Sequence, residues 1–196
     1  MQKRLLHIIQ NLSTWLIPLA GLAIIIGFLY IAPEGILGKA DALGYAVCHR
    51  LDARSFHLDG RQLPLCARCS GMYLGAVLGI IFLRLRYRHS AGIPPKTVLA
   101  IFIVFILAFA LDGVNSYLYL MKSVYREKLN FIPVLYTPNN TLRLFTGSGT
   151  GLAMAVAIFI SFNQTLWRDW NNQRVLEKPL DVSILLLLML GIDALT

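Results

Sequence analysis

The chain has 196 residues, of which 57% are hydrophobic and 14% are charged, and its mean hydropathy is +0.64. This composition excludes a disordered protein and argues against a soluble domain, because a soluble domain of this length needs a charged surface. The net charge of +8 does not indicate a nucleic-acid partner, because most basic residues flank apolar runs and the sequence has no RNA- or DNA-binding motif. The composition therefore predicts a polytopic membrane protein.

Five apolar segments follow one another along the chain, and each is expected to form a helix. About 20 apolar residues span a bilayer as a helix, so the first four segments are long enough and the fifth is short. We interpret the first segment as a retained helix rather than a cleaved signal peptide, because Ile31-Ala32-Pro33 is a poor cleavage site. The expected fold is an all-α, polytopic transmembrane helical bundle of four to five spans, forming one integral membrane domain over residues 1–196. The spans are expected at about residues 15–32, 66–85, 97–121, 143–166 and 180–196, with a Cys/His loop at residues 33–65.

The basic residues favour an N-terminus in the cytoplasm. The segment from Arg84 to Lys96 holds four basic residues and no acidic residue, whereas the 33–65 loop mixes both signs. Short positive loops stay inside, so we expect an integral protein of a prokaryotic cytoplasmic membrane with its N-terminus in the cytoplasm. With five spans, the 33–65 loop, the 122–140 loop and the C-terminus share the outer side, and nearly all unusual polar residues lie towards that leaflet.

Small residues recur at every fourth position in the second and the fourth span. On a helix, this spacing forms one bare stripe that lets another backbone approach closely. We expect both spans to lie in the interior of the bundle and to pack on neighbouring helices through these stripes. The stripes consist of Gly71, Gly75 and Gly79 in the second span, and of Gly147, Gly151 and Ala155 in the fourth.

All three cysteines of the chain lie close together in the sequence, beside two histidines. Cys66-x-x-Cys69 opens the second span, so both thiols point to the same side of the helix. Together with Cys48 and with either His49 or His57, they would complete a tetrahedral zinc site. Three ligands alone would leave an open coordination position, as in a catalytic site. The zinc interpretation leaves the choice between the two histidines open.

Two other interpretations of the cysteines compete with the zinc site. A C-x-x-C pair at a helix N-terminus has a lowered thiol pKa, and the neighbouring Arg68 adds positive charge. Membrane disulfide enzymes that act with a quinone use such a pair, but they generally need a second pair, and this chain has one cysteine left over. Alternatively, the three cysteines are buried as small hydrophobic residues of the bundle.

The third span carries a carboxylate that is costly within a membrane unless it is paired or faces a polar cavity. This residue is Asp112, and Asn115 and Ser116 follow it on the same helix face. Arg143, at the entrance of the fourth span, is its expected partner. These residues would form either an ion-pair network that holds the helices in register or a polar pocket under the Cys/His loop. In the second case, the candidate catalytic residues are Asp112, Arg143 and Arg68, and the candidate substrate-binding residues are Asn115, Asn140 and Thr146.

Several short motifs are shared with one protein family. They are Cys48-His49-Arg50, Arg54-Ser55-Phe56, Leu65-Cys66-Ala67-Arg68-Cys69-Ser70-Gly71 with Tyr73 and Gly75, Leu111-Asp112-Gly113, and Asn140-Thr141 with Arg143, Thr146 and Gly147. These motifs resemble a family of small microbial membrane proteins that is known as a domain of unknown function. The resemblance covers most of residues 40–155. It implies a multispan fold with a shared set of Cys, His, Asp, Asn and Arg residues, and it implies no activity.

The leading functional hypothesis is a membrane protein with a zinc site that caps a polar intramembrane pocket. Its substrate would be lipidic or isoprenoid, and the sequence leaves open whether it is an enzyme. The first alternative is a thiol–disulfide redox protein that uses Cys66 and Cys69 with a quinone. The second is a transporter or channel subunit, in which Asp112 and the arginines line the path. The expected partners are membrane lipid, a lipidic or quinone ligand and further copies of the chain, without nucleic acid.

Overall fold

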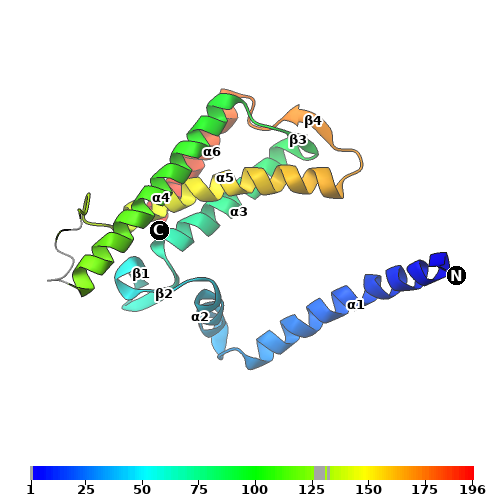
Figure 1. Cartoon of the computed structure of the whole chain (residues 1–196), viewed down its shortest axis with the longest axis horizontal. Helices are drawn as coiled ribbons and strands as arrows, with labels where there is room; N and C mark the ends of the chain where they lie inside the picture. Colours follow the sequence, from blue (N-terminus) through cyan, green and yellow to red (C-terminus); the bar gives the residue numbers. More distant parts are fainter. Residues whose placement is uncertain (1, 126–130, 132) are drawn as a thin grey trace. The chain divides into compact units, whose positions relative to one another are not determined.

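The computed structural model of the chain describes residues 2–125, 131 and 133–196, and within them most residues are helical (Figure 1). The chain divides into two compact units, residues 1–47 and residues 48–196. The first unit contains helices α1 (Gln2–Ile31) and α2 (Gly35–Val47). The second contains α3 (Ala67–Tyr87), α4 (Lys96–Val124), α5 (Asn140–Leu166) and α6 (Pro179–Leu195), with the short strands β1 (Ser55–Leu58), β2 (Arg61–Cys66), β3 (Ser90–Gly92) and β4 (Asn171–Arg174).

Four helices of the described residues are long and apolar enough to cross a membrane, namely α1, α3, α4 and α5. Helix α6 has 17 residues. At 1.5 Å per residue, it is about 25 Å long, which is less than the roughly 30 Å of a bilayer's hydrocarbon core. These helices confirm the prediction of an all-α, polytopic transmembrane protein with four to five spans.

The first unit consists of two helices joined by a short turn, and its apolar side chains are largely exposed. Most side chains of α1 from Trp15 to Ile31 are exposed, which fits a helix that faces lipid. The turn between the two helices is held by Lys39, whose Nζ donates hydrogen bonds to the carbonyl oxygens of Leu29, at 3.0 Å, and Pro33, at 3.3 Å.

The segment at residues 33–65 is more ordered than the expected loop. Besides α2, it contains a 3₁₀ turn at Asp52–Arg54 and an antiparallel hairpin of β1 and β2. The hairpin turns at Asp59-Gly60, where both residues have positive φ angles, of 50° and 77°. An Asp-Gly pair is the usual signal of such a turn, because both central residues must adopt a left-handed conformation. The turn is therefore signalled by the sequence itself, within a segment that is expected above to be a loop.

The central contact of the second unit joins α3 to α5 through their glycines. A Cβ atom on Gly75 would collide with backbone atoms of Ser148, and one on Gly151 would collide with the backbone of Met72. Gly71 and Gly147 make equivalent contacts with the opposite helix. The two backbones therefore touch directly, which confirms the predicted packing through small-residue stripes.

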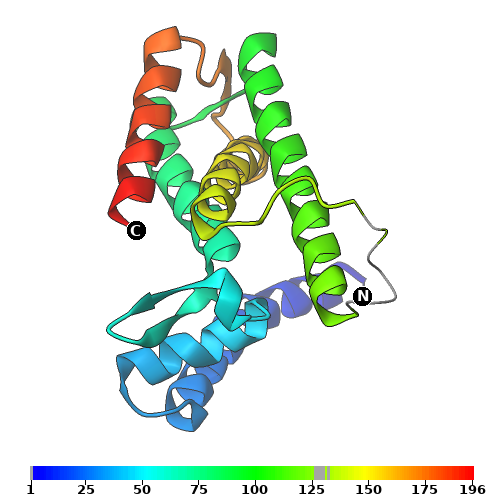
Figure 2. The same cartoon turned by 90° about the vertical axis from the view of Figure 1, so that its left-hand side faces the viewer.

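Helix α5 is surrounded by the other helices of the second unit. Figure 2 looks almost along α5 (yellow), with α4 (green) on one side and α6 (red) and α3 (teal) on the other. The ring of Phe105 in α4 packs on Gly149, and Ser148 donates a 2.6 Å hydrogen bond to Asp193 in α6. This central position explains why nearly every residue from Arg143 to Leu152 is buried.

At the end of the second unit that lies away from the β1–β2 hairpin, a group of hydrogen bonds around Asp181 forms what we call the polar anchor. The carboxylate of Asp181 in α6 is 4% exposed and accepts hydrogen bonds from Tyr87 Oη, at 2.5 Å, and from Arg86 Nε, at 3.2 Å. An apolar cluster lies beside this anchor and includes Leu83, Leu152, Leu176 and Leu185. The anchor and the cluster therefore hold α3 and α6 together at this end of the unit. The residues of the predicted site lie at the opposite end, beside the β1–β2 hairpin.

We expect the substitution Gly75→Ala to destabilise the protein by about 1–3 kcal/mol, because the added methyl group overpacks the contact between two backbones. The measurement is thermal unfolding in detergent. The matched control is Gly191→Ala, where a Cβ atom meets nothing within 4 Å and the greater helix propensity of alanine acts alone. Equal stability of the two variants would contradict the close packing of α3 on α5.

Candidate functional site

The three cysteines meet at the N-terminus of α3. Cys66 ends strand β2 and caps α3, Cys69 lies in the first turn of that helix, and Cys48 precedes the hairpin. Their three Sγ atoms all lie within 4.8 Å of one another, and they form the one such cluster of metal-type ligands among the described residues. All three are free thiols, Cys48 buried and the other two half-buried. This arrangement can hold one metal ion between three sulfur ligands.

Backbone N–H groups and a neighbouring thiol donate hydrogen bonds to two of the three sulfur atoms in this cluster. The N–H groups of Arg50 and Cys66 donate to Cys48 Sγ, at 3.5 and 3.4 Å. Arg50 itself has a positive φ of 46°, so the chain turns sharply at this residue, directly after Cys48 and His49. Cys66 precedes the membrane-spanning helix, and a hydrogen bond from the Cys69 thiol lowers the pKa of the Cys66 thiol. Thiolates are the forms that bind metals and attack disulfides.

Neither histidine belongs to this cluster of sulfur atoms in the described part of the chain. His49 is exposed beside Cys48, and His57 lies on strand β1, where its Nε2 is 2.8 Å from Asp52 Oδ1. A histidine as fourth ligand therefore stays a prediction. The structure brings together the three cysteines of the predicted site and leaves a fourth position without a protein ligand from the described residues.

A buried carboxylate lies at the same end of the bundle as the cysteines. Asp112 in α4 is 1% exposed, forms an ion pair with Arg68 through Oδ2, and accepts a 2.6 Å hydrogen bond from Tyr136 through Oδ1. Arg143 was expected to be its partner, and this expectation is wrong. Arg68 extends from the first turn of α3 to α4, where its guanidinium group lies beside Gly113, the residue that follows Asp112.

Tyr136 is a member of this cluster that the sequence analysis did not identify. It lies between α4 and α5, outside every predicted span, and no motif marks it. Burial, together with the hydrogen bond to Asp112, raises the pKa of Tyr136 to about 12. The phenol therefore stays protonated near neutral pH and donates to the carboxylate.

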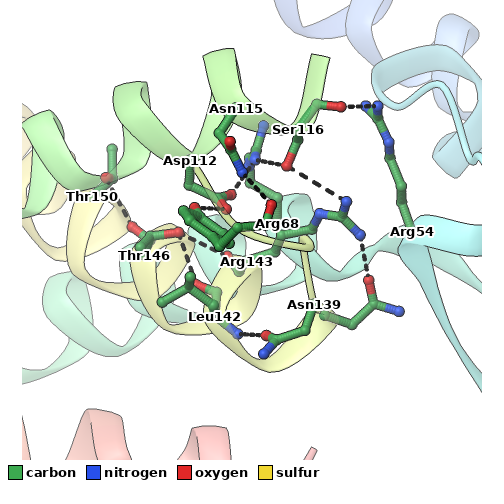
Figure 3. A network of polar contacts seen from close by, with 12 residues as sticks. Arg54, Arg68, Asp112, Asn115, Ser116, Asn139, Leu142, Arg143, Thr146 and Thr150 are labelled. Carbon is green, nitrogen blue, oxygen red and sulfur yellow. Dashed lines mark hydrogen bonds and ion pairs between the residues drawn. The ribbon is translucent and has the colours of Figure 1, made fainter. Parts of the chain in front are cut away.

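Three arginines converge on Ser116 of α4 (Figure 3). Arg54 Nη2 donates to its carbonyl oxygen at 2.9 Å, and the Nη2 atoms of Arg68 and Arg143 lie 3.4 and 3.5 Å from its hydroxyl oxygen. We call Arg54, Arg68 and Arg143 the arginine cluster. Arg54 belongs to one of the family-like motifs, Arg54-Ser55-Phe56, but its spacing along the chain does not indicate that it lies beside Ser116. Burial lowers the pKa of Arg54, and the positive charge of Arg68 lowers it further.

The three candidate substrate-binding residues make internal hydrogen bonds. The Asn115 amide donates to the Tyr136 carbonyl oxygen at 3.0 Å and accepts from the Leu135 N–H at 2.9 Å. Asn140 accepts a 2.7 Å hydrogen bond from Arg143 and donates to the Ser55 carbonyl oxygen of the hairpin. The Thr146 hydroxyl donates to the backbone of its own helix. These contacts hold the residues around the cluster in place, and a role in binding a substrate stays a prediction.

The arginine cluster lies near one end of the helices rather than at their middle. Arg68 and Arg143 are within the first four residues of α3 and α5. Helix α4 has 29 residues, or about 43 Å of length, which exceeds the hydrocarbon thickness, so Asp112 can lie level with the ends of its neighbours. The charge of Cys66 interacts with those of Arg54 and Arg143, so the cysteines and the arginine cluster are neighbours.

Comparisons with known proteins place this region within one sequence family. A family model described as "Predicted membrane protein (DUF2085)" matches residues 48–158, which include all three cysteines and the arginine cluster. An uncharacterized protein of Methanothermobacter thermautotrophicus is 32% identical over 110 residues, which are 56% of this chain and 82% of the relative. The uncharacterized protein MJ1492 of Methanocaldococcus jannaschii is 28% identical over 125 residues, 63% of this chain and 69% of the relative. No solved structure gives a significant match.

We expect Asp112→Asn to destabilise the protein by on the order of 3 kcal/mol, because it leaves the Arg68 charge without its buried partner. Thermal unfolding in detergent measures this loss. Asp59→Asn is the matched control, since Asp59 is exposed in the hairpin turn and asparagine tolerates its left-handed conformation. A double variant with Arg68→Met should recover part of the stability, and additive losses would contradict the coupling of the two residues.

Proposed function

The chain belongs to the DUF2085 family of predicted membrane proteins, and on that premise we propose that it is an integral membrane protein with a zinc site formed by Cys48, Cys66 and Cys69. The proposal rests on the positions of the three Sγ atoms, which all lie within 4.8 Å of one another. Three thiols that come from two separate segments and are held this close match the sulfur ligands of a tetrahedral zinc site.

The surroundings of the cysteines support a site for a thiolate-bound cation. The two N–H groups that donate to Cys48 Sγ would also orient that sulfur as a ligand. Zinc with three thiolates carries one net negative charge, and the adjacent Arg54 and Arg143 supply positive charge. The site is thus compatible in charge with the arginine cluster beside it.

The proposed site has three protein ligands, so its fourth position is open to water or to a bound molecule. A zinc ion with an open position polarises the group that binds there and lowers the pKa of bound water. We propose a substrate with a lipidic or isoprenoid chain, whose polar end reaches the arginine cluster from the membrane. Asp112 would orient Arg68 and Tyr136, to which it is bonded, and Arg143 would bind the polar end of the substrate.

We further propose that the N-terminus is cytoplasmic, which places the three cysteines on the outer side of a prokaryotic cytoplasmic membrane. The short, basic Arg84–Lys96 connection between α3 and α4 supports this orientation. Membrane lipid is the immediate partner of the exposed apolar side chains of α1 and α4.

A second candidate function is thiol–disulfide exchange, which the lowered pKa of the Cys66 thiol favours. In this reaction, the thiols of Cys66 and Cys69 would form a disulfide and give two electrons and two protons to a quinone, which becomes a quinol. The oxidising environment outside the cytoplasm is compatible with this chemistry. Both functions use the same cysteines, so the state of the thiols distinguishes them.

We expect the purified protein to contain about one zinc ion per chain, because three ligands from one site bind one tetrahedral ion. Elemental analysis measures the zinc, and a thiol count before and after chelation measures the free thiols. The variants Cys66→Ser and Cys69→Ser should lose the metal. His57→Gln is the matched control and should keep it, because His57 pairs with Asp52 away from the sulfur atoms.

Three outcomes of this measurement lead to different conclusions. Thiols that react only after chelation would support the zinc site. Absence of metal, together with a Cys66–Cys69 disulfide that forms and breaks with the redox potential, would favour the second candidate. Absence of metal with permanently free thiols would contradict both functions.

A further inference from the structure

The arginine cluster has more positive charge than its surroundings compensate. Arg54, Arg68 and Arg143 come from a 3₁₀ turn, α3 and α5, and all three point towards Ser116. Among the described residues, the carboxylate bonded to this cluster is that of Asp112, which pairs with Arg68. Two guanidinium charges therefore lack a bonded counter-ion from this part of the chain.

The guanidinium groups also lack hydrogen-bond acceptors. The Nε atoms of Arg68 and Arg143 are buried and have no partner among the described residues, although the Arg143 residue is only 6% exposed. Two of the three contacts with Ser116 go to one hydroxyl oxygen, at 3.4 and 3.5 Å, which is the outer limit for a hydrogen bond. Buried donors without an acceptor are costly, so the cluster has the composition of a binding site for an anion.

We propose that Arg54, Arg68 and Arg143 bind a phosphate-type oxyanion. Guanidinium groups from three separate elements can approach such an ion from three directions, and the ion offers at least three acceptor oxygens. A carboxylate offers two oxygens, and Asp112 already occupies one side of Arg68. Phosphate carries between one and two negative charges near neutral pH, and its charge is opposite to that of Arg54 and Arg143, which have no bonded carboxylate among the described residues.

The cluster is reachable from outside the helix bundle. The Arg68 side chain is 20% exposed, and Arg54 is only partly buried. An oxyanion would replace the Ser116 hydroxyl, the weakest acceptor of the cluster. This inference deepens the proposed function, since it gives the chemical class of the polar end of the substrate, but it does not require that zinc be bound.

The same oxyanion could come from two sources. Arg68 and Arg143 lie near the ends of their helices, at the level where a lipid headgroup would place its phosphate. A free phosphate could enter from the aqueous side, where the hairpin and Arg54 lie. The experiment below uses one probe for each source.

The test measures binding of inorganic phosphate and of phosphatidic acid to the full-length protein in a neutral detergent. Thermal unfolding follows the phosphate titration, with chloride of equal ionic strength as the reference. Native mass spectrometry compares phosphatidic acid with diacylglycerol, which differs from it by the phosphate alone. Arg54→Gln is the main variant, because Arg54 bonds one backbone carbonyl oxygen and its loss should spare the fold.

We expect Arg54→Gln to raise the Kd for the bound probe roughly tenfold to a hundredfold, because the variant loses one charge-assisted contact. Arg54→Lys should recover part of the binding, because it restores the charge without the planar fork. Arg168→Gln, an exposed residue beyond the far end of α5, is the matched control and should bind like the wild type.

Binding of inorganic phosphate would support the proposal with a free ion, and binding of phosphatidic acid alone would support it with a lipid headgroup. The proposal is overturned if the wild type binds neither probe, or if Arg54→Gln, shown to be folded by circular dichroism, binds as tightly as the wild type. Zinc is measured in the same samples. If metal-free protein binds either probe, the result supports the oxyanion site. The absence of zinc would then contradict only the proposed zinc site.

Discussion

The direct contact between the backbones of α3 and α5 is the constraint on which the rest of the second unit depends. Gly75 and Gly151 carry no side chain, so each admits a backbone carbonyl of the other helix. In a lipid environment, apolar side chains gain little by leaving the bilayer for one another, and close packing is a principal force between helices. Any larger side chain at these positions would separate the helices and, with them, the groups attached to their N-terminal ends.

The positions of the reactive groups beside the β1–β2 hairpin depend on this contact between α3 and α5. Helix α3 begins with Cys66, Arg68 and Cys69, and α5 begins with Asn140 and Arg143. Because the two helices touch along their glycines, their N-terminal ends come together and bring Arg68, Arg143 and two of the three thiols to one place. Asp112 then enters from α4 and compensates one of the charges. Thiolates, guanidinium groups and a buried carboxylate stabilise one another there by their opposite charges.

The ion pair of Asp112 depends on the tertiary structure and not on spacing along the sequence. On sequence spacing, Arg143 is the nearest arginine at the start of a span. The ion pair forms with Arg68 instead, because Arg68 extends from α3 past Gly113, while Arg143 bonds Asn140 and Ser116. The 3₁₀ turn before the hairpin adds Arg54, which donates to the backbone of Ser116, a residue 62 positions later in the chain. Contacts of this kind depend on side-chain length and direction, which spacing does not contain.

The sequence by itself determined the all-α membrane fold, the stripes that pack α3 on α5, and the residue types gathered at one end, because these follow from local patterns of hydropathy and from spacing along one helix. The Asp59-Gly60 turn was readable in the same way. Only the tertiary structure decided which arginine pairs with Asp112, that Tyr136 and Arg54 belong to the cluster, and that the three sulfur atoms meet. These outcomes are long-range, and they depend on how closely two glycine-lined helices approach and on the direction in which each side chain then points.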